Sequence, residues 1–190
     1  MDTADQSGDR EAGRWRQVGS VSAITSKWLS VDCNTYVTPA GRVDDYYVLT
    51  RNDFVLVIAV DDDCVLMVRQ YRPATDRFYL ALPAGYVEPG EDELSAARRE
   101  LWEETGAHAT DWEQVGELHP LPGYVHSAAH VFRCRIDGFG AKPSVRGDDT
   151  EGIEAVRLRR QDVLRGIKNG EIIEMQTVSA ILLAQLKGNL

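Results

Sequence analysis

The sequence predicts a mixed α/β fold in which a small antiparallel β meander precedes a larger domain. The chain has 190 residues, which at about 100–200 residues per domain corresponds to one domain with a small addition. Strand-like alternation occupies residues 15–50, and buried strand patterns with one clear helix follow it. We therefore divide the chain into a disordered tail at 1–14, the meander at 15–50 and the main domain at 51–190.

The composition is that of a folded protein and restricts its partners. Apolar residues make up 43% and charged residues 27%, both close to the averages for globular domains. The formal net charge of −9 argues against nucleic acids and anionic membrane surfaces as partners. We also expect no signal peptide and no membrane span. Three cysteines without a C-x-x-C pair indicate reduced thiols, so we expect a cytoplasmic protein.

The first part of the chain reads as a succession of strands. Residues 27–33 and 45–50 alternate between apolar and polar side chains, and Pro39–Arg42 supplies a turn between them. This pattern predicts the meander, which we expect to form dimers. Residues 54–60 and 64–71 are near-continuous apolar runs around an acidic turn, so we expect a hairpin buried on both faces.

The second part mixes helices with strands. The clearest helix spans residues 91–105 and is closed by Gly106. We expect strands near 112–118, 130–136 and 152–158, a loop over 138–147, and helices at 161–166 and 176–187. In the last helix, four apolar residues recur at helical spacing and are expected in the core: Val178, Ile181, Leu182 and Leu186.

Three carboxylates in the 91–105 helix form the main candidate site. Glu100, Glu103 and Glu104 are spaced i, i+3, i+4, so they share one helix face. That face lies about 100° around the helix from the apolar stripe and should flank the buried side. Such like charges repel each other, and a hard divalent cation would relieve the repulsion. The alternative is an ordinary solvated acidic face.

The residues around this helix resemble a known signature. Residues 85–107 read GYVEPGEDELSAARRELWEETGA, which matches the Nudix box, G-x5-E-x7-R-E-U-x-E-E-x-G-U, at every strictly fixed position. Only Ala107 is smaller than the usual bulky aliphatic residue U. Further segments resemble the ADP-ribose pyrophosphatase branch of Nudix hydrolases: VRQYRP at 68–73, LPAG at 82–85, PGY at 122–124 and GEIIEMQT at 170–177.

The resemblance implies a fold and a metal site. It implies an α/β/α sandwich around a mixed sheet, with the box as a loop–helix–loop. Mg²⁺, or Mn²⁺ in its place, would be held by Glu100, Glu103, Glu104 and the main-chain carbonyl of Ala84. Within the box, a Glu91–Arg99 pair would hold the loop, and two glycines would serve backbone turns, namely Gly85 and Gly106.

The resemblance also implies an acidic pair in a late loop, here within DDTEGI at 148–153. Glu151 fits the position of a further metal ligand. Asp149 falls where the branch usually has a glutamate that acts as the catalytic base, so its reach is shorter by one methylene. An ordinary acidic loop is the alternative. Two further departures, Ala81 and Ser127, lie in segments that face the substrate in similar proteins.

Candidate substrate-binding residues come from three other segments. Arg69 and Arg72 could hold phosphate groups, or they could serve only solubility. Trp28 could stack a nucleobase, or it could lie in the core or in a dimer interface. Gly123 belongs to the proline–glycine segment of the branch. The i, i+4 pair of His126 and His130 lies on a loop entering a strand, which disfavours a metal site.

Together these residues predict a homodimeric, Mg²⁺-dependent hydrolase that acts on a nucleoside diphosphate linked to another group. The lead substrate implied by the resemblance is ADP-ribose, which would give AMP and ribose 5-phosphate. The same chemistry on another nucleotide sugar or on a dinucleotide is one alternative. A non-catalytic Nudix-like nucleotide sensor is the other, although a binding protein would not need the complete set of glutamates.

Overall fold

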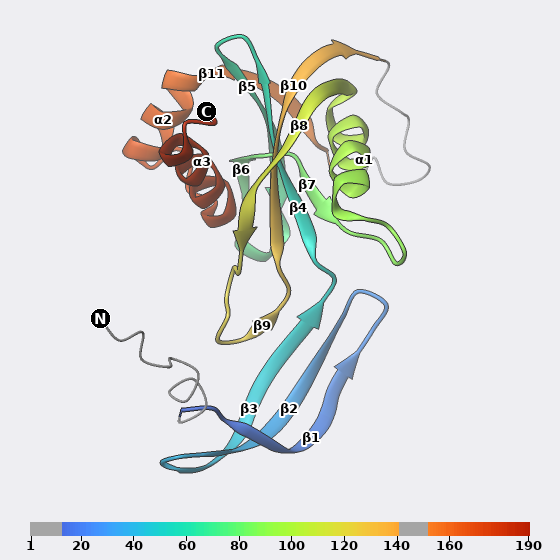
Figure 1. Cartoon of the computed structure of the whole chain (residues 1–190), viewed down its shortest axis with the longest axis vertical. Helices are drawn as coiled ribbons and strands as arrows, with labels where there is room; N and C mark the ends of the chain where they lie inside the picture. Colours follow the sequence, from blue (N-terminus) through green and yellow to red (C-terminus); the bar gives the residue numbers. More distant parts are fainter. Residues whose placement is uncertain (1–12, 141–151) are drawn as a thin grey trace, which may run out of the picture. The chain divides into compact units, whose positions relative to one another are not determined.

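The computed structural model describes residues 13–140 and 152–190 of the chain (Figure 1). These residues form two compact units. One unit consists of the described chain up to Arg51 together with Leu121–Ser127, and the other consists of Asn52–Pro120 and the described residues from Ala128 to Leu190. No helix in the described ranges is long and apolar enough to cross a membrane. The predicted tail lies, except for residues 13 and 14, outside the described chain.

The N-terminal unit contains a four-stranded sheet in the order β1-β2-β3-β9. The antiparallel meander predicted from the alternating pattern is confirmed, because β1 pairs with β2 and β2 with β3 in antiparallel register. The fourth strand comes from much later in the chain and runs parallel to β3. The strands are β1 Arg16–Thr25, β2 Leu29–Thr38, β3 Gly41–Arg51 and β9 Val125–His126.

The larger unit is built on a mixed sheet in the order β11-β5-β4-β10-β8, with β6 paired to β5 and β7 paired to β4. Strand β10 runs parallel to β4, and every other strand pairing of this sheet within the described residues is antiparallel. The predicted 54–71 hairpin is confirmed as β4 and β5. The strands are β4 Phe54–Asp61, β5 Cys64–Arg72, β6 Arg77–Ala81, β7 Ala84–Tyr86, β8 Ala107–Leu118, β10 Ala129–Phe139 and β11 Glu154–Arg159.

Helices cover both faces of this sheet, with α1 on one side and α2 and α3 on the other (Figure 1). The alternation along β4 explains the arrangement. Val55 and Val57 pack in the cluster that contains α1, whereas Leu56 and Ile58 pack in the cluster that contains α2 and α3. The predicted α/β/α sandwich is therefore confirmed. The helices are α1 Glu93–Thr105, α2 Arg160–Asn169 and α3 Met175–Lys187, and a 3₁₀ turn spans Pro73–Thr75.

One prediction about the core was wrong. Leu182 and Leu186 in α3 are 42% and 86% exposed, although their spacing with Ile181 suggested burial. The buried face of α3 is made instead by Thr177, Ala180, Ile181 and Ala184. Alanines at this face let the helix approach the sheet closely, and Leu182 follows Ile181 by one residue, about 100° around the helix.

Several element boundaries also differ from the expected ones. Ala84–Tyr86 lies outside the strands expected from the sequence, but it pairs with β4 as strand β7. Strand β10 continues through Gly138 and Phe139, which were expected in the following loop. Helix α2 is longer than the expected 161–166. Short strands such as β7 and β9 have too few residues for a period of two to be visible in the sequence.

Candidate active site

Helix α1 is fixed at both ends by residues that suit those positions. The side chain of Asp92 accepts a hydrogen bond from the Ser95 amide at 3.0 Å and so caps the first turn. Gly106 adopts φ 72° at the other end, and its amide donates to the Trp102 carbonyl at 2.8 Å. The helix therefore begins at Glu93, two residues after the expected start, because Asp92 is its cap.

The three carboxylates of the box flank the buried side of α1, as their spacing predicted. Glu104 is 9% exposed, and Glu100 and Glu103 are half-buried. One oxygen of Glu104 accepts a hydrogen bond from the Ala84 amide at 3.1 Å, which ties the helix to strand β7. The apolar side of the helix, including Ala97 and Leu101, is buried in the core. The fold thus holds three acidic side chains beside the sheet.

Gly85 lies directly against the carboxylate of Glu100. A Cβ atom at position 85 would stand 2.0 Å from both Cδ and Oε1 of Glu100, which is far inside van der Waals contact. Gly85 is in strand β7, and its φ is not positive. What it provides is therefore space for Glu100, in place of the backbone turn that we expected. Gly106, with its left-handed φ, does serve a turn.

Arg99 connects the box loop with the carboxylates. Its Nε and Nη2 donate to the two oxygens of Glu91, each at 2.9 Å, and Nη2 also donates to the Tyr86 carbonyl at 2.9 Å. Its Nη1 donates to Glu100 at 2.6 Å and to Glu103 at 3.3 Å. The expected Glu91–Arg99 pair is present and is bidentate, which is the strong geometry for an arginine and a carboxylate.

This network shifts the protonation equilibria of its members. The hydrogen bonds to Glu91 raise the pKa of Arg99 above its ordinary value, and the same contacts lower the pKa of Glu91. Glu100 behaves differently, because burial raises the pKa of its carboxyl more than the Arg99 guanidinium lowers it. A cation beside Glu100 would offset this cost of burying its charge.

The donor atoms fit a hard divalent cation, although they are not arranged around one. Among residues 13–140 and 152–190, no three His, Cys, Asp or Glu side chains lie together in an arrangement that could hold a metal ion. Arg99 Nη1 contacts both Glu100 and Glu103, and Glu104 turns toward the Ala84 amide. A cation on this face would compete with Arg99 Nη1 for the carboxylates of Glu100 and Glu103. The Nε and Nη2 atoms of Arg99 could still donate to Glu91. Carboxylate oxygens are the ligands that Mg²⁺ prefers.

The second acidic pair falls outside the described chain. Asp149 and Glu151 both belong to the segment 141–151, which the structure does not describe. The described chain resumes at Gly152, and β11 begins at Glu154. Glu154 pairs with Arg69 of β5. The roles of Asp149 as catalytic base and of Glu151 as metal ligand therefore stay predictions.

The two candidate phosphate-binding arginines lie in the second half of β5, at Arg69 and Arg72. The Arg69 guanidinium stacks over the ring of Phe78 at 3.8 Å and lies 3.9 Å from Glu154. Arg72 is exposed at the end of the strand, opposite Arg77 of β6. Ala81 of β6 is buried, so this departure from the branch pattern puts a small apolar group where a glutamate is usual.

Trp28 and Gly123 belong to the N-terminal unit. The Trp28 side chain is 66% exposed within this chain, which excludes the alternative that it lies in the core. Gly123 lines a cavity of about 310 Å³ whose lining includes Tyr124 and a cluster of three mutually contacting aromatic rings, and the Tyr46 hydroxyl donates to the Gly123 carbonyl. The clustered rings are Trp15, Tyr36 and Tyr46, whose centroids lie 5.4–5.9 Å apart.

Sequence reasoning missed this aromatic cluster, although one signal was available. Tyr36 and Tyr46 lie in the two adjacent strands on either side of the predicted Pro39–Arg42 turn. Aromatic side chains on paired strands contact one another across the sheet. The two histidines that the sequence analysis considered and disfavoured as a metal pair belong to different units: His126 to the N-terminal unit and buried His130 to the larger one.

Comparison with known proteins agrees with this geometry. The family model described as the NUDIX domain matches residues 49–175. An ADP-sugar pyrophosphatase of Mus musculus is 33% identical over 157 residues, which cover 73% of this chain and 70% of the relative. An ADP-ribose pyrophosphatase of Bacillus subtilis (strain 168) is 30% identical over 151 residues, covering 78% and 80%. A crystal structure of an ADP compounds hydrolase superposes with a TM-score of 0.77 at 24% identity, covering 93% of this chain and 97% of the other.

Proposed function

The chain belongs to the Nudix hydrolase family and is a pyrophosphohydrolase of that family, and from this premise we propose that it cleaves ADP-ribose to AMP and ribose 5-phosphate. The observation that carries the proposal is the convergence of the box side chains on one side of α1. Glu104 is tied to Ala84, Glu100 occupies the space beside Gly85, and Arg99 contacts Glu100 and Glu103. The names of the curated relatives support ADP-ribose and ADP-sugars as the substrate class.

We assign Mg²⁺, or Mn²⁺ in its place, to Glu100, Glu103, Glu104, the Ala84 carbonyl and Glu151. When bound, such a cation neutralises negative charge on the pyrophosphate and acidifies water. The carboxylates hold this charge in a half-buried environment, where electrostatic interactions are stronger than in bulk water. Arg99 positions two of them, and its bidentate pair with Glu91 keeps the guanidinium in place.

The reaction needs a base and no covalent intermediate. Water attacks one phosphorus atom, its proton passes to a carboxylate, and the bond from that phosphorus to the bridging oxygen breaks, so that two phosphate monoesters leave. We assign the proton transfer to Asp149, whose shorter side chain requires the water to lie closer than a glutamate would. A nucleophilic Ser or Cys is not part of the proposal, because no activating base accompanies one in the sequence motifs.

Substrate binding is assigned to four residues outside the box. Arg69 and Arg72 would contact the phosphates, which need fixed cations in a chain of net charge −9. Trp28, which is 66% exposed within the chain, would stack the nucleobase on the ring face opposite Lys27, whose Nζ lies 4.3 Å from the ring centroid. Gly123 would contact the substrate through the proline–glycine segment. The buried Ala81 and Ser127 are the positions at which specificity could depart from ADP-ribose.

We further propose that the protein is a cytoplasmic homodimer assembled through the meander. Strand β1 is at the edge of its sheet, and all ten of its residues are exposed. Three of them are large and apolar: Val18 at 44%, Val21 at 71% and Ile24 at 57% exposure. An exposed apolar edge strand readily pairs with another chain. The three free cysteines agree with a reducing compartment.

The proposal is tested by following product release from ADP-ribose, nucleotide sugars, NADH and diadenosine polyphosphates, with and without Mg²⁺. We expect AMP from ADP-ribose, no product with a chelator, and a loss of about 100-fold or more in kcat for Glu104→Gln. Glu93→Gln is the matched control, because Glu93 is exposed in the first turn of the same helix.

The outcomes separate the alternatives. Cleavage of a different panel member would keep the chemistry and reject ADP-ribose as the substrate. Near-normal turnover by Glu104→Gln would remove α1 from the mechanism. Tight nucleotide binding without any hydrolysis would instead identify a sensor.

A further inference from the structure

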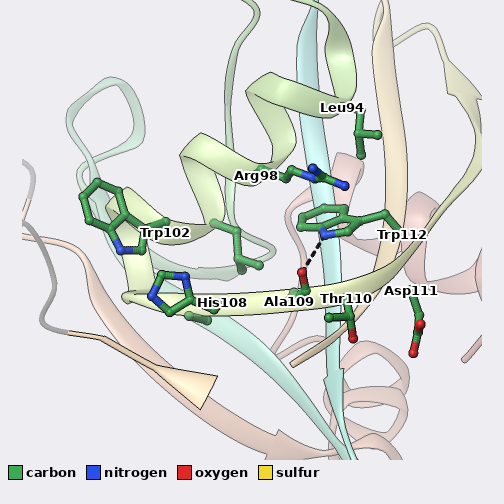
Figure 2. A pocket seen from close by; sticks show the side chains of 10 residues that line it. Leu94, Arg98, Trp102, His108, Ala109, Thr110, Asp111 and Trp112 are labelled. Atoms are coloured by element: carbon green, nitrogen blue, oxygen red, sulfur yellow. Dashed lines mark hydrogen bonds between the residues drawn. The ribbon is translucent and has the colours of Figure 1, made fainter. Parts of the chain in front are cut away.

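A second pocket lies on the far side of α1 from the acidic face. It is an open cavity of about 510 Å³ between α1 and β8, within the larger unit (Figure 2). At about 100° per residue, Arg98 and Trp102 project from α1 on a face roughly opposite to Glu100, Glu103 and Glu104. None of the lining residues belongs to the set assigned to hydrolysis. The lining comprises Leu94, Arg98, Leu101, Trp102 and the run from Ala107 to Trp112.

Two indoles and one guanidinium form the walls of this pocket. Figure 2 shows Trp102 and His108 at one side of the cavity, with Arg98 over Trp112 at the other. The Trp112 Nε1 donates to the Ala109 carbonyl at 2.9 Å, so the polar edge of this indole is already satisfied. Trp102 is 37% exposed, although tryptophan usually loses most of its surface on folding. The pocket thus presents aromatic surface over a floor that contains buried Leu101.

Arg98 is available to an anion. Its Cζ lies 5.8 Å from the centre of the Trp112 ring, and no ion pair to it is found among residues 13–140 and 152–190. Neighbouring Arg99, by contrast, contacts three glutamates. A guanidinium resting on an indole is held in place, yet its N–H groups stay free to meet a phosphate. The hydroxyl of Thr110, which is exposed on the pocket rim, can serve a sugar.

We infer that this pocket is a second binding site, and that it takes a mononucleotide with its base against the indoles and its phosphate against Arg98. The volume lies within the range of about 300–1,000 Å³ found for small-molecule sites. Aromatic side chains bind any nucleobase through its π face. The net charge of −9 disfavours a nucleic-acid strand as the source of that nucleotide. This site goes beyond the proposed hydrolysis and does not depend on it.

The test is calorimetric titration of the full chain with AMP, adenosine and inorganic phosphate, in EDTA so that no hydrolysis occurs. We expect AMP to bind more tightly than adenosine, and phosphate alone not to bind. Trp102→Ala should weaken AMP binding by about tenfold or more, and Trp102→Phe should restore most of it. Arg98→Gln should reduce the affinity for AMP to that for adenosine. Arg159→Gln is the matched control, since it removes one exposed positive charge from β11.

Hydrolysis provides an independent readout. We expect kcat/KM for ADP-ribose to stay within twofold of the wild type in Arg98→Gln and Trp102→Ala. A parallel fall in AMP binding and hydrolysis would place the pocket in the active site and overturn the inference. Unchanged AMP affinity in both variants, or no AMP binding by the wild type, would also overturn it. Absence of hydrolysis in the wild type would count against the proposed function alone.

Discussion

At Gly85, a hydrogen atom in place of a methyl group leaves the room that the Glu100 carboxylate occupies. The same carboxylate receives a hydrogen bond from Arg99 at 2.6 Å, and burial raises its pKa. Its position therefore depends on the absence of one side chain and on the presence of another. A small displacement here should matter for catalysis, since misplacing a reacting group by about 1 Å can cost about 100-fold in rate.

Gly85→Ala should reduce kcat/KM by about tenfold or more and change Tm by only a few degrees. The new Cβ meets the end of a flexible side chain, so Glu100 moves while the backbone of β7 keeps its pairing with β4. Steady-state kinetics and thermal unfolding measure the two effects. Gly19→Ala is the control, because a Cβ there would meet only Thr35 at 3.6 Å. A large loss of Tm with unaltered kinetics in the folded fraction would contradict this role.

At this scale the sequence predicted the members of the site and missed several of their contacts. The i, i+3, i+4 spacing of Glu100, Glu103 and Glu104 placed them on one side of α1 correctly. The Arg99 contact with both Glu100 and Glu103 could not be predicted, because it depends on side-chain rotamers. The pocket between Trp102 and Trp112 was missed for another reason: it forms only when β8 packs beside α1, a tertiary arrangement that periodicity does not reveal.

At the scale of the element, the N-terminal cap of α1 is the feature most open to measurement. Both oxygens of Asp92 engage Ser95, one with its amide at 3.0 Å and the other with its hydroxyl at 2.6 Å. Hydrogen bonding to Ser95 lowers the pKa of Asp92, so this carboxylate is charged at neutral pH. A negative charge here also interacts favourably with the helix dipole.

Asp92→Ala should lower the free energy of unfolding by about 1 kcal/mol, the usual cost of losing such a cap. For a chain of this size, that corresponds to a fall in Tm of about 2–4 °C. Asp92→Asn should lose much less, since the amide oxygen can still accept the Ser95 amide. Chemical denaturation gives the free energies, with Glu93→Ala as the control on the neighbouring exposed residue. Equal losses of unfolding free energy in Asp92→Ala and Asp92→Asn would show that the negative charge of Asp92 stabilises the helix, and that the capping hydrogen bond does not.

Long elements were predictable and short ones were not. The hairpin of β4 and β5 and helix α1 carry enough residues for their periods and end signals to be read. Strands β7 and β9 have three and two residues, and their extended conformation is imposed by pairing with β4 and β3. Leu186 in α3 shows the opposite failure: its spacing fits an apolar stripe, yet the packing face is set by Ala180 and Ala184.

At the scale of the whole molecule, the proposed dimer depends on the edge strand β1. Val21→Lys places a charge in the middle of this strand, which is a common natural means of preventing edge-to-edge pairing. We expect the wild type to be a dimer and Val21→Lys to be monomeric, or to dissociate at least tenfold more readily, in light scattering after size-exclusion chromatography. Leu186→Lys is the control, because Leu186 is equally apolar and 86% exposed in the other unit. A wild-type monomer, or a dimer unaffected by Val21→Lys, would reject this interface.

The pairing of β9 with β3 also affects how the chain is made. Leu49 pairs with Val125, so the partner of β3 is synthesised 125 − 49 = 76 residues later. At about 5–20 residues per second, that interval lasts roughly 4–15 s on a ribosome. During this time β1, β2 and β3 can form an antiparallel three-stranded sheet, but the edge of β3 that later pairs with β9 has no neighbouring strand. The first segment to be translated therefore completes its sheet only after β8 of the other unit has emerged, and a fragment ending at Arg51 would keep that edge open permanently.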